Sequence, residues 1–373
     1  MLENSLTYLL VLVSYLFLGF LEYRFPVYKR NIQFVECLFF IFFFGLRGYI
    51  GTDWINYYEY YTTKSIWNFT RYEPGFCLLT NLCSAINLSY NSWIFLIVVL
   101  QGFLFDFFFS KKIKYMYLAY IILISFFPNL IIDTLRNFIS ILIGLISLDK
   151  WANRHRAESL MLLLLSISFH STGIVFALLL PMTRSYLSKK SVIVLFTIGL
   201  IIYFLRIEYI KPIISIMGNI LPSSYSMMID TYLTSEVASS SYGVSFGIIE
   251  KIFFFIVVML KYDFITRSQI LEKYIFNLFV LYILSQFYLS EMSILITRFA
   301  IIFFAGYLVS LASINYIYSI KSNRIILSCL LLFLCFIKTS ISYSSKIYEY
   351  SNIIFAYENI NERKYFVRQH YSI

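Results

Sequence analysis

Charged residues are scarce in this sequence, and those beside long apolar runs are the candidates for chemistry. The densest group lies in residues 45–76, which read GLRGYIGTDWINYYEYYTTKSIWNFTRYEPGF. Arg47 supplies a cation there, and Asp53 and Glu73 supply carboxylates that can bind hydroxyl groups or act as a base. A charged side chain at bilayer depth costs at least about 2.5–3.5 kcal/mol, so such residues are functional candidates by default.

Small and aromatic residues surround these charges. Gly48 and Gly51 allow the backbone to approach a ligand closely or to adopt a positive φ. Tyr57 and the tyrosines that follow it offer amphipathic rings to a ligand. An interfacial aromatic belt with snorkelling arginines explains the same pattern without a ligand, and for the tyrosines both interpretations stay open.

A second polar group begins at Asp133 and precedes a long apolar run. Arg136 follows three residues later and shares a helix face with Asn137 and Ser140. One interpretation is a self-contained Asp133–Arg136 ion pair near the membrane interface. The functional interpretation is an arginine that meets an anionic head group.

Two further polar residues lie inside apolar runs. His170, in SISFHSTGIVF, is either hydrogen-bonded to a neighbouring helix or acts as a base or phosphate donor near neutral pH. Arg298, in ITRFAIIFFAG, follows Glu291 by seven residues, which makes direct pairing of the two marginal.

Three arginines on one predicted side of the membrane suggest a common ligand. Arg47, Arg136 and Arg298 could converge on a phosphate or diphosphate, because arginine stays charged and binds phosphate oxygens bidentately. The sequence has no Gly-rich phosphate loop, zinc signature or GxSxG elbow. We therefore expect no metal or cofactor, and we expect an activated substrate that arrives in the membrane on a lipid carrier.

The elements that must position these residues are membrane helices. The chain has 373 residues, of which 60% are hydrophobic and 13% charged, against about 25% charged in soluble domains. Its apolar runs are continuous and approach the ~20 residues that a membrane helix needs. The sequence predicts an all-α polytopic membrane protein with about 10–12 transmembrane helices. The apolar segments are roughly 6–21, 32–46, 76–90, 92–109, 115–128, 134–149, 159–181, 191–210, 244–261, 273–290, 293–314 and 325–343.

These segments predict one transmembrane domain, 1–343, with outer loops 47–75 and 211–243 and a polar tail, 344–373. Basic residues after the first run predict a cytoplasmic loop there, which places the N-terminus and loop 47–75 outside. The first run has no basic leader and no small-residue cleavage site, so we expect a retained helix.

Twelve simple crossings cannot place every basic cluster in the cytoplasm. We therefore expect that 76–90 is re-entrant, or that 159–181, which is interrupted near His170, turns back. The net charge of +10 fits such topology signals rather than nucleic-acid binding, and the five cysteines form no metal or redox motif.

The succession LRGYIGTDWINYY, EPGF, DTLRNFISILIGLISL, SFHSTGIVFALLL and ITRFAIIFF resembles the EpsG-type branch of the Wzy-like polymerases of bacterial O-antigen and exopolysaccharide. The resemblance covers about residues 40–310, and its strongest part is RG-x-x-GTD-x-x-x-Y followed by E-x-G-F. Ser and Thr follow His170 where a Pro or similar small residue is expected. The motif residues of the family fall on Arg47, Gly51, Asp53, Tyr57, Glu73, Arg136, His170 and Arg298.

The resemblance implies a glycosyltransferase of the bacterial inner membrane with a helical, GT-C-like fold. Such enzymes join oligosaccharide repeat units carried on undecaprenyl diphosphate at the periplasmic face. It implies catalytic roles for Asp53, Glu73 and His170. It also implies substrate binding by Arg47, Gly51, Tyr57, Arg136 and Arg298. The expected partners are the lipid-linked oligosaccharide, the bilayer and a chain-length regulator protein, with no nucleic acid.

Two other functions are alternatives to the polymerase. An O-antigen ligase would carry a larger outer loop than this sequence has. A flippase or transporter of lipid-linked oligosaccharides needs alternating access, and the sequence shows no internal repeat of the kind that many transporters use.

Overall fold

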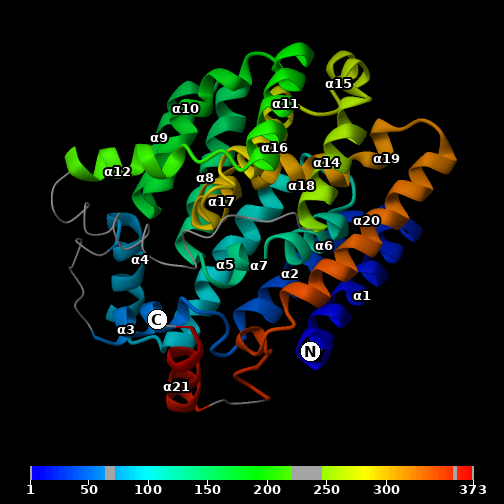
Figure 1. Ribbon diagram of the computed structural model, residues 1–373. Coiled ribbons are helices and arrows are strands. Elements are labelled where there is room, and N and C mark those ends of the chain that lie inside the picture. The colour runs from blue at the N-terminus through cyan, green and yellow to red at the C-terminus, as the bar shows by residue number, and fades with distance from the viewer. Residues whose placement is uncertain (1, 64–71, 221–245, 356–358, 372–373) are drawn as a thin grey trace. The chain divides into compact units, whose positions relative to one another are not determined.

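The computed structural model describes residues 2–63, 72–220, 246–355 and 359–371. Over these residues the chain is built of helices, with one isolated β-bridge between Arg47 and Asn352 and no strand (Figure 1). The prediction of an all-α protein is confirmed. Contacts divide the chain into two compact units, 1–181 with 322–373, and 182–321. The predicted single domain 1–343 stays a prediction.

The first unit contains most of the helices that concern the candidate site. They are α1 (Leu2–Arg24), η1 (Pro26–Tyr28), α2 (Lys29–Gly45), α3 (Trp54–Thr62), α4 (Pro74–Ala85), α5 (Tyr90–Phe109), α6 (Met116–Phe126), α7 (Pro128–Ile132), α8 (Leu135–Ala152), α9 (Arg156–Phe169), η2 (Ser171–Gly173), α10 (Ile174–Leu179), α20 (Lys321–Ser342), η5 (Lys346–Tyr348) and α21 (Ile360–Tyr371).

The second unit begins within η3 (Leu180–Thr183). Its other helices are α11 (Lys189–Leu205), α12 (Ile210–Ile220), α14 (Phe246–Met259), α15 (Tyr262–Ser268), α16 (Lys273–Tyr288), α17 (Ser293–Phe299), η4 (Ala300–Phe303), α18 (Phe304–Ala312) and α19 (Ile314–Ile317). Among them α16 packs against α11 and α18. The buried Glu291 carboxylate accepts the backbone N–H groups of Tyr209, Ile210 and Lys211 at 2.8, 2.5 and 2.8 Å and thereby caps α12.

Several helices are long and apolar enough to cross a membrane. By length and composition, four described stretches qualify: 4–24, 90–109, 293–312 and 321–342. The pair α11 and α12, bent by 89°, adds a fifth if it counts as one span. A multi-pass membrane protein is therefore confirmed, while the expected 10–12 crossings stay a prediction.

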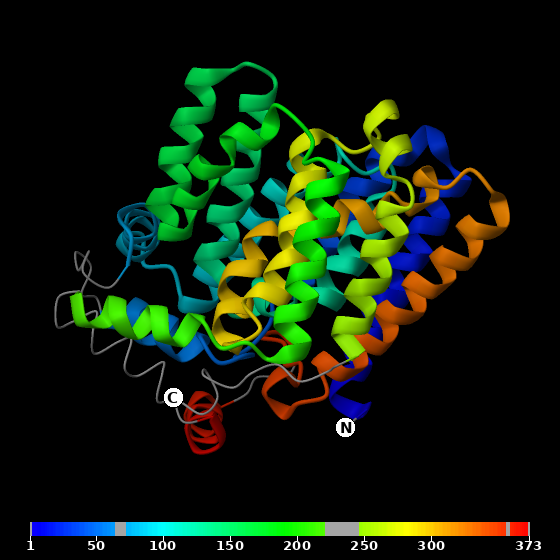
Figure 2. The ribbon, with the colours of Figure 1, turned by 45° about the horizontal axis from the view of Figure 1, so that its top comes forward.

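The hairpin of α8 and α9 is fastened by two rungs of serine. Ser140 and Ser166 donate their hydroxyls to each other's backbone carbonyl, both at 2.8 Å. Ser147 and Ser159 repeat the arrangement seven residues away along each helix, at 2.8 and 2.9 Å. All four side chains are fully buried, and small residues of this kind let membrane helices approach closely. The rungs fix the start of α8 beside the end of α9 (Figures 1 and 2).

The predicted interruption of the 159–181 run is present in the structure. Helix α9 ends at Phe169, and α10 follows the short η2 turn. The Phe176 ring of α10 packs against Gly144, midway between the two serine rungs of α8. Helix α10 therefore folds back along the hairpin, as expected for a run that turns back. Helix α4, at 12 residues, is shorter than the ~20 residues of a simple crossing.

The two predicted outer loops contain helices where they are described. Loop 47–75 includes α3, and its residues 64–71 lie outside the described residues. Loop 211–243 begins with α12, and the remainder, 221–243, also lies outside them. The described part of the tail 344–373 belongs to the first unit, where the Ile353 N–H donates to the carbonyl of Leu46 at 3.0 Å.

Candidate functional site

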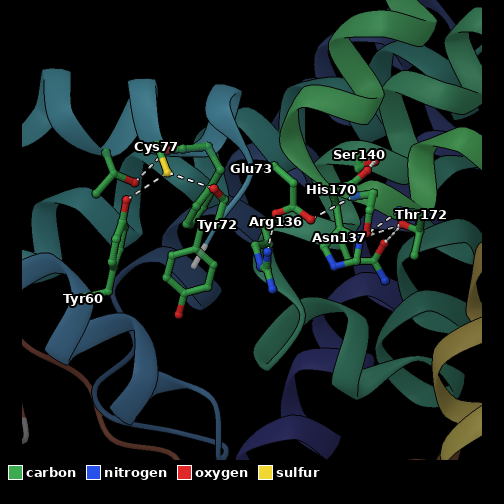
Figure 3. Close-up of polar contacts among 12 residues, drawn as sticks. Tyr60, Tyr72, Glu73, Cys77, Arg136, Asn137, Ser140, His170 and Thr172 are labelled. Carbon is green, nitrogen blue, oxygen red and sulfur yellow. Dashed lines mark hydrogen bonds and ion pairs between the residues drawn. The ribbon is translucent and has the colours of Figure 1, made fainter. Parts of the chain in front are cut away.

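Glu73, Arg136 and His170 come together where three helices of the first unit meet (Figure 3). Glu73 immediately precedes α4, Arg136 lies in the first turn of α8, and His170 follows α9. The Arg136 guanidinium forms an ion pair with the Glu73 carboxylate. The other Glu73 oxygen accepts the backbone N–H of Ser171 at 2.9 Å. One carboxylate thus joins α8 to the turn that carries His170.

The Glu-Pro-Gly sequence explains how this carboxylate reaches its partners. Glu73 has extended backbone angles, φ −68° and ψ 150°, and Pro74 occupies the first helical position of α4, where its missing N–H costs nothing. A Cβ on Gly75 would lie 2.4 Å from the Ser168 hydroxyl oxygen and 2.9 Å from its carbonyl oxygen. Only glycine therefore lets the start of α4 lie against the end of α9.

Aromatic rings hold the Arg136 side chain. Its guanidinium carbon lies 4.5 Å from the centre of the Tyr72 ring, a distance typical of a cation–π contact. The Tyr57 hydroxyl is another neighbour, within hydrogen-bonding reach of the guanidinium. The side chains of Arg136 and Glu73 keep exposed fractions of 22% and 20%. The pair is therefore positioned by protein and still accessible to a ligand.

Glu73 is ionised at neutral pH. Burial raises the pKa of its carboxyl, but the charge of Arg136, the Ser171 N–H and His170 together bring that pKa below its ordinary value of 4.5. A carboxylate with a lowered pKa is a weak base near pH 7. The arrangement suits Glu73 as an electrostatic partner that orients Arg136.

His170 begins a short relay of polar groups. Its Nδ1 lies 2.9 Å from the Thr172 hydroxyl oxygen and 3.2 Å from the Thr172 backbone nitrogen. The Thr172 hydroxyl donates to Oδ1 of Asn137 at 2.6 Å. The Thr172 N–H requires Nδ1 as an acceptor, whereas the hydroxyl oxygen, whose proton goes to Asn137, requires Nδ1 as a donor. The protonation state of the ring therefore selects between the two contacts.

Asp53 directly precedes α3, and the Asp133 carboxylate binds the backbone of its loop. Oδ1 of Asp133 accepts the backbone N–H groups of Thr52 and Asp53 at 2.7 and 3.2 Å. Gly51 has φ +88°, and a Cβ there would lie 2.3 Å from that same oxygen. Gly51 shapes the loop and contacts Asp133. Asp53 in turn lies within electrostatic reach of Tyr57, the neighbour of Arg136.

The structure decides whether Asp133 and Arg136 form a self-contained ion pair, as one interpretation of the sequence holds. Asp133 and Arg136 form no ion pair with each other in the described part of the chain. Asp133 holds the loop before α3, and Arg136 pairs with Glu73. Asn137 and Ser140, predicted on the same helix face, contact Thr172 and Ser166.

The Arg47 side chain is buried and binds backbone groups of the protein. Its guanidinium donates to the carbonyls of Ile131 and Ile132 at 3.0 and 2.9 Å and so satisfies the end of α7. With an exposed fraction of 5% for Arg47 and 4% for Tyr57, neither side chain is presented to a ligand as Arg136 is. Arg298 is exposed on α17 of the second unit, and its convergence with the other arginines stays a prediction.

Some residues of this region were not found from the sequence. Tyr72 was overlooked, and its only signal is its position directly before the Glu-Pro-Gly motif. Thr172 was read as part of the interruption, although its hydroxyl links His170 to Asn137. In the described residues, no group of three or more His, Cys, Asp or Glu side chains is arranged to hold a metal ion.

Comparison with protein families finds a match. The model of the EpsG family matches residues 30–358, which is most of the chain and includes every residue of the site described above. No curated protein and no solved structure matches the chain. The expected GT-C-like architecture therefore stays a prediction.

Proposed function

The chain belongs to the EpsG family, and from this premise we propose that it is a membrane glycosyltransferase that polymerises oligosaccharide repeat units. The proposed donor and acceptor are repeat units on undecaprenyl diphosphate. The proposed place is the periplasmic face of the bacterial inner membrane, and the product is O-antigen or a related surface polysaccharide. Family membership and the apolar helices support a membrane polymerase. The observation that carries the chemistry is the accessible Glu73–Arg136 pair beside His170.

The reaction places its largest charge change at the diphosphate. The oxygen of the acceptor hydroxyl forms a bond to the anomeric carbon of the donor sugar, and the bond from that carbon to the diphosphate breaks. Negative charge builds on the departing lipid diphosphate, and a preorganised guanidinium stabilises it. Arg136 is suited to this task because Glu73 and Tyr72 fix its orientation while a fifth of its side chain is exposed.

The proton of the acceptor hydroxyl passes to a base. A neutral imidazole carries a ring nitrogen that can accept this proton, so His170 is the first candidate, whereas Glu73 is a weak base because its pKa is lowered. Asp53 is the second candidate, since its loop leads into α3 and toward Tyr57. We further propose that a chain-length regulator protein acts together with the enzyme.

The proposal is tested by the substitution Arg136→Ala. We expect membrane insertion to persist and long-chain polysaccharide to disappear, because the leaving group loses its cation. A gel of surface polysaccharide from complemented cells reports the ladder of chain lengths, and an immunoblot of membranes reports the protein. Arg156→Ala is a matched control, because Arg156 also stacks on an aromatic ring, Trp151 at 3.8 Å, at the other end of the same hairpin.

The accumulated product distinguishes the alternatives. Lipopolysaccharide capped with a single repeat unit in deletion cells supports a polymerase. Free polymer on its lipid carrier indicates a ligase, and repeat units trapped on the cytoplasmic face indicate a flippase. A normal ladder in the Arg136→Ala cells would refute the role of Arg136.

A further inference from the structure

The loop that carries Asp53 is paired with a segment about 300 residues further along the chain. The Gly48 N–H donates to the carbonyl of Ser351 at 2.9 Å, and the Gly51 N–H donates to that of Ile347 at 3.0 Å. We call residues 345–353 together with α21 the C-terminal clasp. The Gly48 and Gly51 amides of the loop before α3 thus find their backbone acceptors in the clasp.

Arg363 of α21 ties this pairing together. Its side chain is 3% exposed. Its Nε donates to the carbonyl of Tyr49 in the loop at 3.0 Å. One terminal nitrogen donates to the carbonyls of Ile347 and Lys346 at 2.9 and 3.1 Å. The planar fork of a guanidinium can serve both segments at once, which a lysine ammonium matches poorly.

A third link runs through Asp133. One oxygen of this carboxylate accepts the N–H groups of Thr52 and Asp53, as described above. The other oxygen lies 3.2 Å from the hydroxyl of Tyr348, which belongs to the clasp and also lies 2.9 Å from Oδ1 of Asn129. The group that orients the start of α3 is therefore itself supported by the clasp.

Helix α3 itself also binds the clasp, through ion pairs with α21. Lys364 and Arg368 of α21 form ion pairs with Glu59 of α3 at 2.5 and 3.1 Å. These pairs are partly exposed, so each contributes little stability by itself. Together with Arg363 they place α21 against the helix that carries Tyr57.

We propose that the C-terminal clasp is a positioning element of the active site and that Arg363 is its central positioning residue. The clasp fixes the position of Asp53 and Tyr57 relative to the Glu73–Arg136 pair. Without the clasp, the Gly48 and Gly51 amides lose their hydrogen-bond acceptors and the loop before α3 shifts. This inference rests on the proposed function for its catalytic consequence, but the clasp itself can be tested without activity.

The experiment compares Arg363→Ala, Arg363→Lys and the control Arg156→Ala, which lies outside the clasp, in the full-length purified protein. Hydrogen–deuterium exchange of the Gly48 and Gly51 amides should be faster in Arg363→Ala, intermediate in Arg363→Lys and unchanged in Arg156→Ala. With a lipid-diphosphate-linked repeat unit as substrate, kcat of Arg363→Ala should fall by about 10²-fold, the effect of a ~1 Å misplacement. KM should change little, and lysine should restore part of kcat.

Each outcome bears on the clasp. Unchanged exchange in Arg363→Ala overturns it, and faster exchange with an unchanged kcat overturns its positioning role. If Arg363→Ala does not accumulate, Tyr348→Phe, which removes one hydroxyl, is measured in the same way against the same two criteria. Failure of the wild-type protein to polymerise repeat units refutes the proposed function, while the exchange data still decide whether the clasp exists.

Discussion

At the scale of single residues, Glu73 has the clearest pH signature. Its folded pKa lies below the ordinary 4.5 because of Arg136, the Ser171 N–H and His170, against the opposing effect of burial. A carboxyl with a depressed folded pKa stabilises the protein above its unfolded pKa, and this contribution disappears as the pH falls through the folded pKa. The stabilisation by Glu73 is therefore complete at pH 7 and is lost below about pH 4.5.

We predict that Glu73→Gln lowers the melting temperature at pH 7 and that the difference from wild type shrinks below about pH 4.5. The reason is that glutamine and a protonated glutamate are both neutral and nearly equal in size. Thermal unfolding in detergent over this pH range provides the measurement. A difference of equal size at pH 7 and at pH 3 would show that the charge of Glu73 is not what stabilises the site.

At this scale, the sequence predicted which residues belong to the site better than it predicted the role of each residue. Glu73, Arg136 and His170 were identified because charged or polar groups in an apolar chain have few reasons to be there. Arg47 carried the same signal, yet its guanidinium binds the carbonyls at the end of α7. Those carbonyls are backbone atoms, which every residue has. The residue types in the sequence therefore cannot show that a distant arginine binds there.

At the scale of elements, the α8–α9 hairpin controls the distance between Arg136 and His170. Its two serine rungs lie seven residues apart along each helix, and Ser147 lies in the rung remote from the site. Because this side chain is fully buried against Ser159, added volume has nowhere to go. Overpacking of a close interface typically costs about 1–3 kcal/mol.

We therefore predict that Ser147→Leu lowers both the melting temperature and polymer formation, whereas Ser147→Ala is tolerated. The alanine removes one interhelical hydrogen bond, worth about 0.6 kcal/mol in membrane proteins, and leaves the spacing intact. Melting curves and the polysaccharide ladder are measured for both variants. Equal behaviour of leucine and alanine would mean that the close packing of the hairpin does not matter.

Interruptions of helices were predictable where a polar residue, a glycine or a proline breaks an apolar run. His170 and Gly173 interrupt an apolar run, and the structure has η2 there with α10 folded back. Pro128 likewise separates α6 from α7, at the end of the apolar segment predicted over 115–128. By contrast, the tail 344–373 looked like a polar appendage, because its contacts with the loop are mostly made by backbone groups.

At the scale of the whole chain, the contacts of the first unit show which segments lie next to one another. The amide of Asn4 donates to the carbonyl of Ser344, and the Tyr8 hydroxyl donates to that of Tyr348. The start of α1 therefore lies beside the clasp and the loop before α3. Basic-residue counting places the N-terminus and loop 47–75 on one side of the membrane; these contacts agree with that placement, which stays a prediction. That this side faces the periplasm stays a prediction.

The opposite side is defined by the far ends of two helices. Helix α5 begins at Tyr90, whose hydroxyl donates to the carbonyl of Trp54 near the loop. Twenty residues later it ends beside Lys112, which pairs with Asp149 near the end of α8 at 2.5 Å. A helix of this length spans about 30 Å, so we predict that the α8–α9 turn lies across the bilayer from the clasp.

This arrangement predicts the accessibility of single cysteines in intact cells. In a Cys329→Ser background, which removes the exposed native thiol among the described cysteines, Thr63→Cys and Tyr365→Cys should react with a membrane-impermeant maleimide from outside. Asn153→Cys, at the α8–α9 turn, should react only after permeabilisation, because its side of the protein carries the basic clusters that are retained in the cytoplasm. Residues 63, 153 and 365 are all exposed, so a difference in labelling reports the side of the membrane and not burial. Reaction of Asn153→Cys from outside together with Tyr365→Cys would contradict this topology, and with it the assignment of the loop and the clasp to a side opposite the α8–α9 turn.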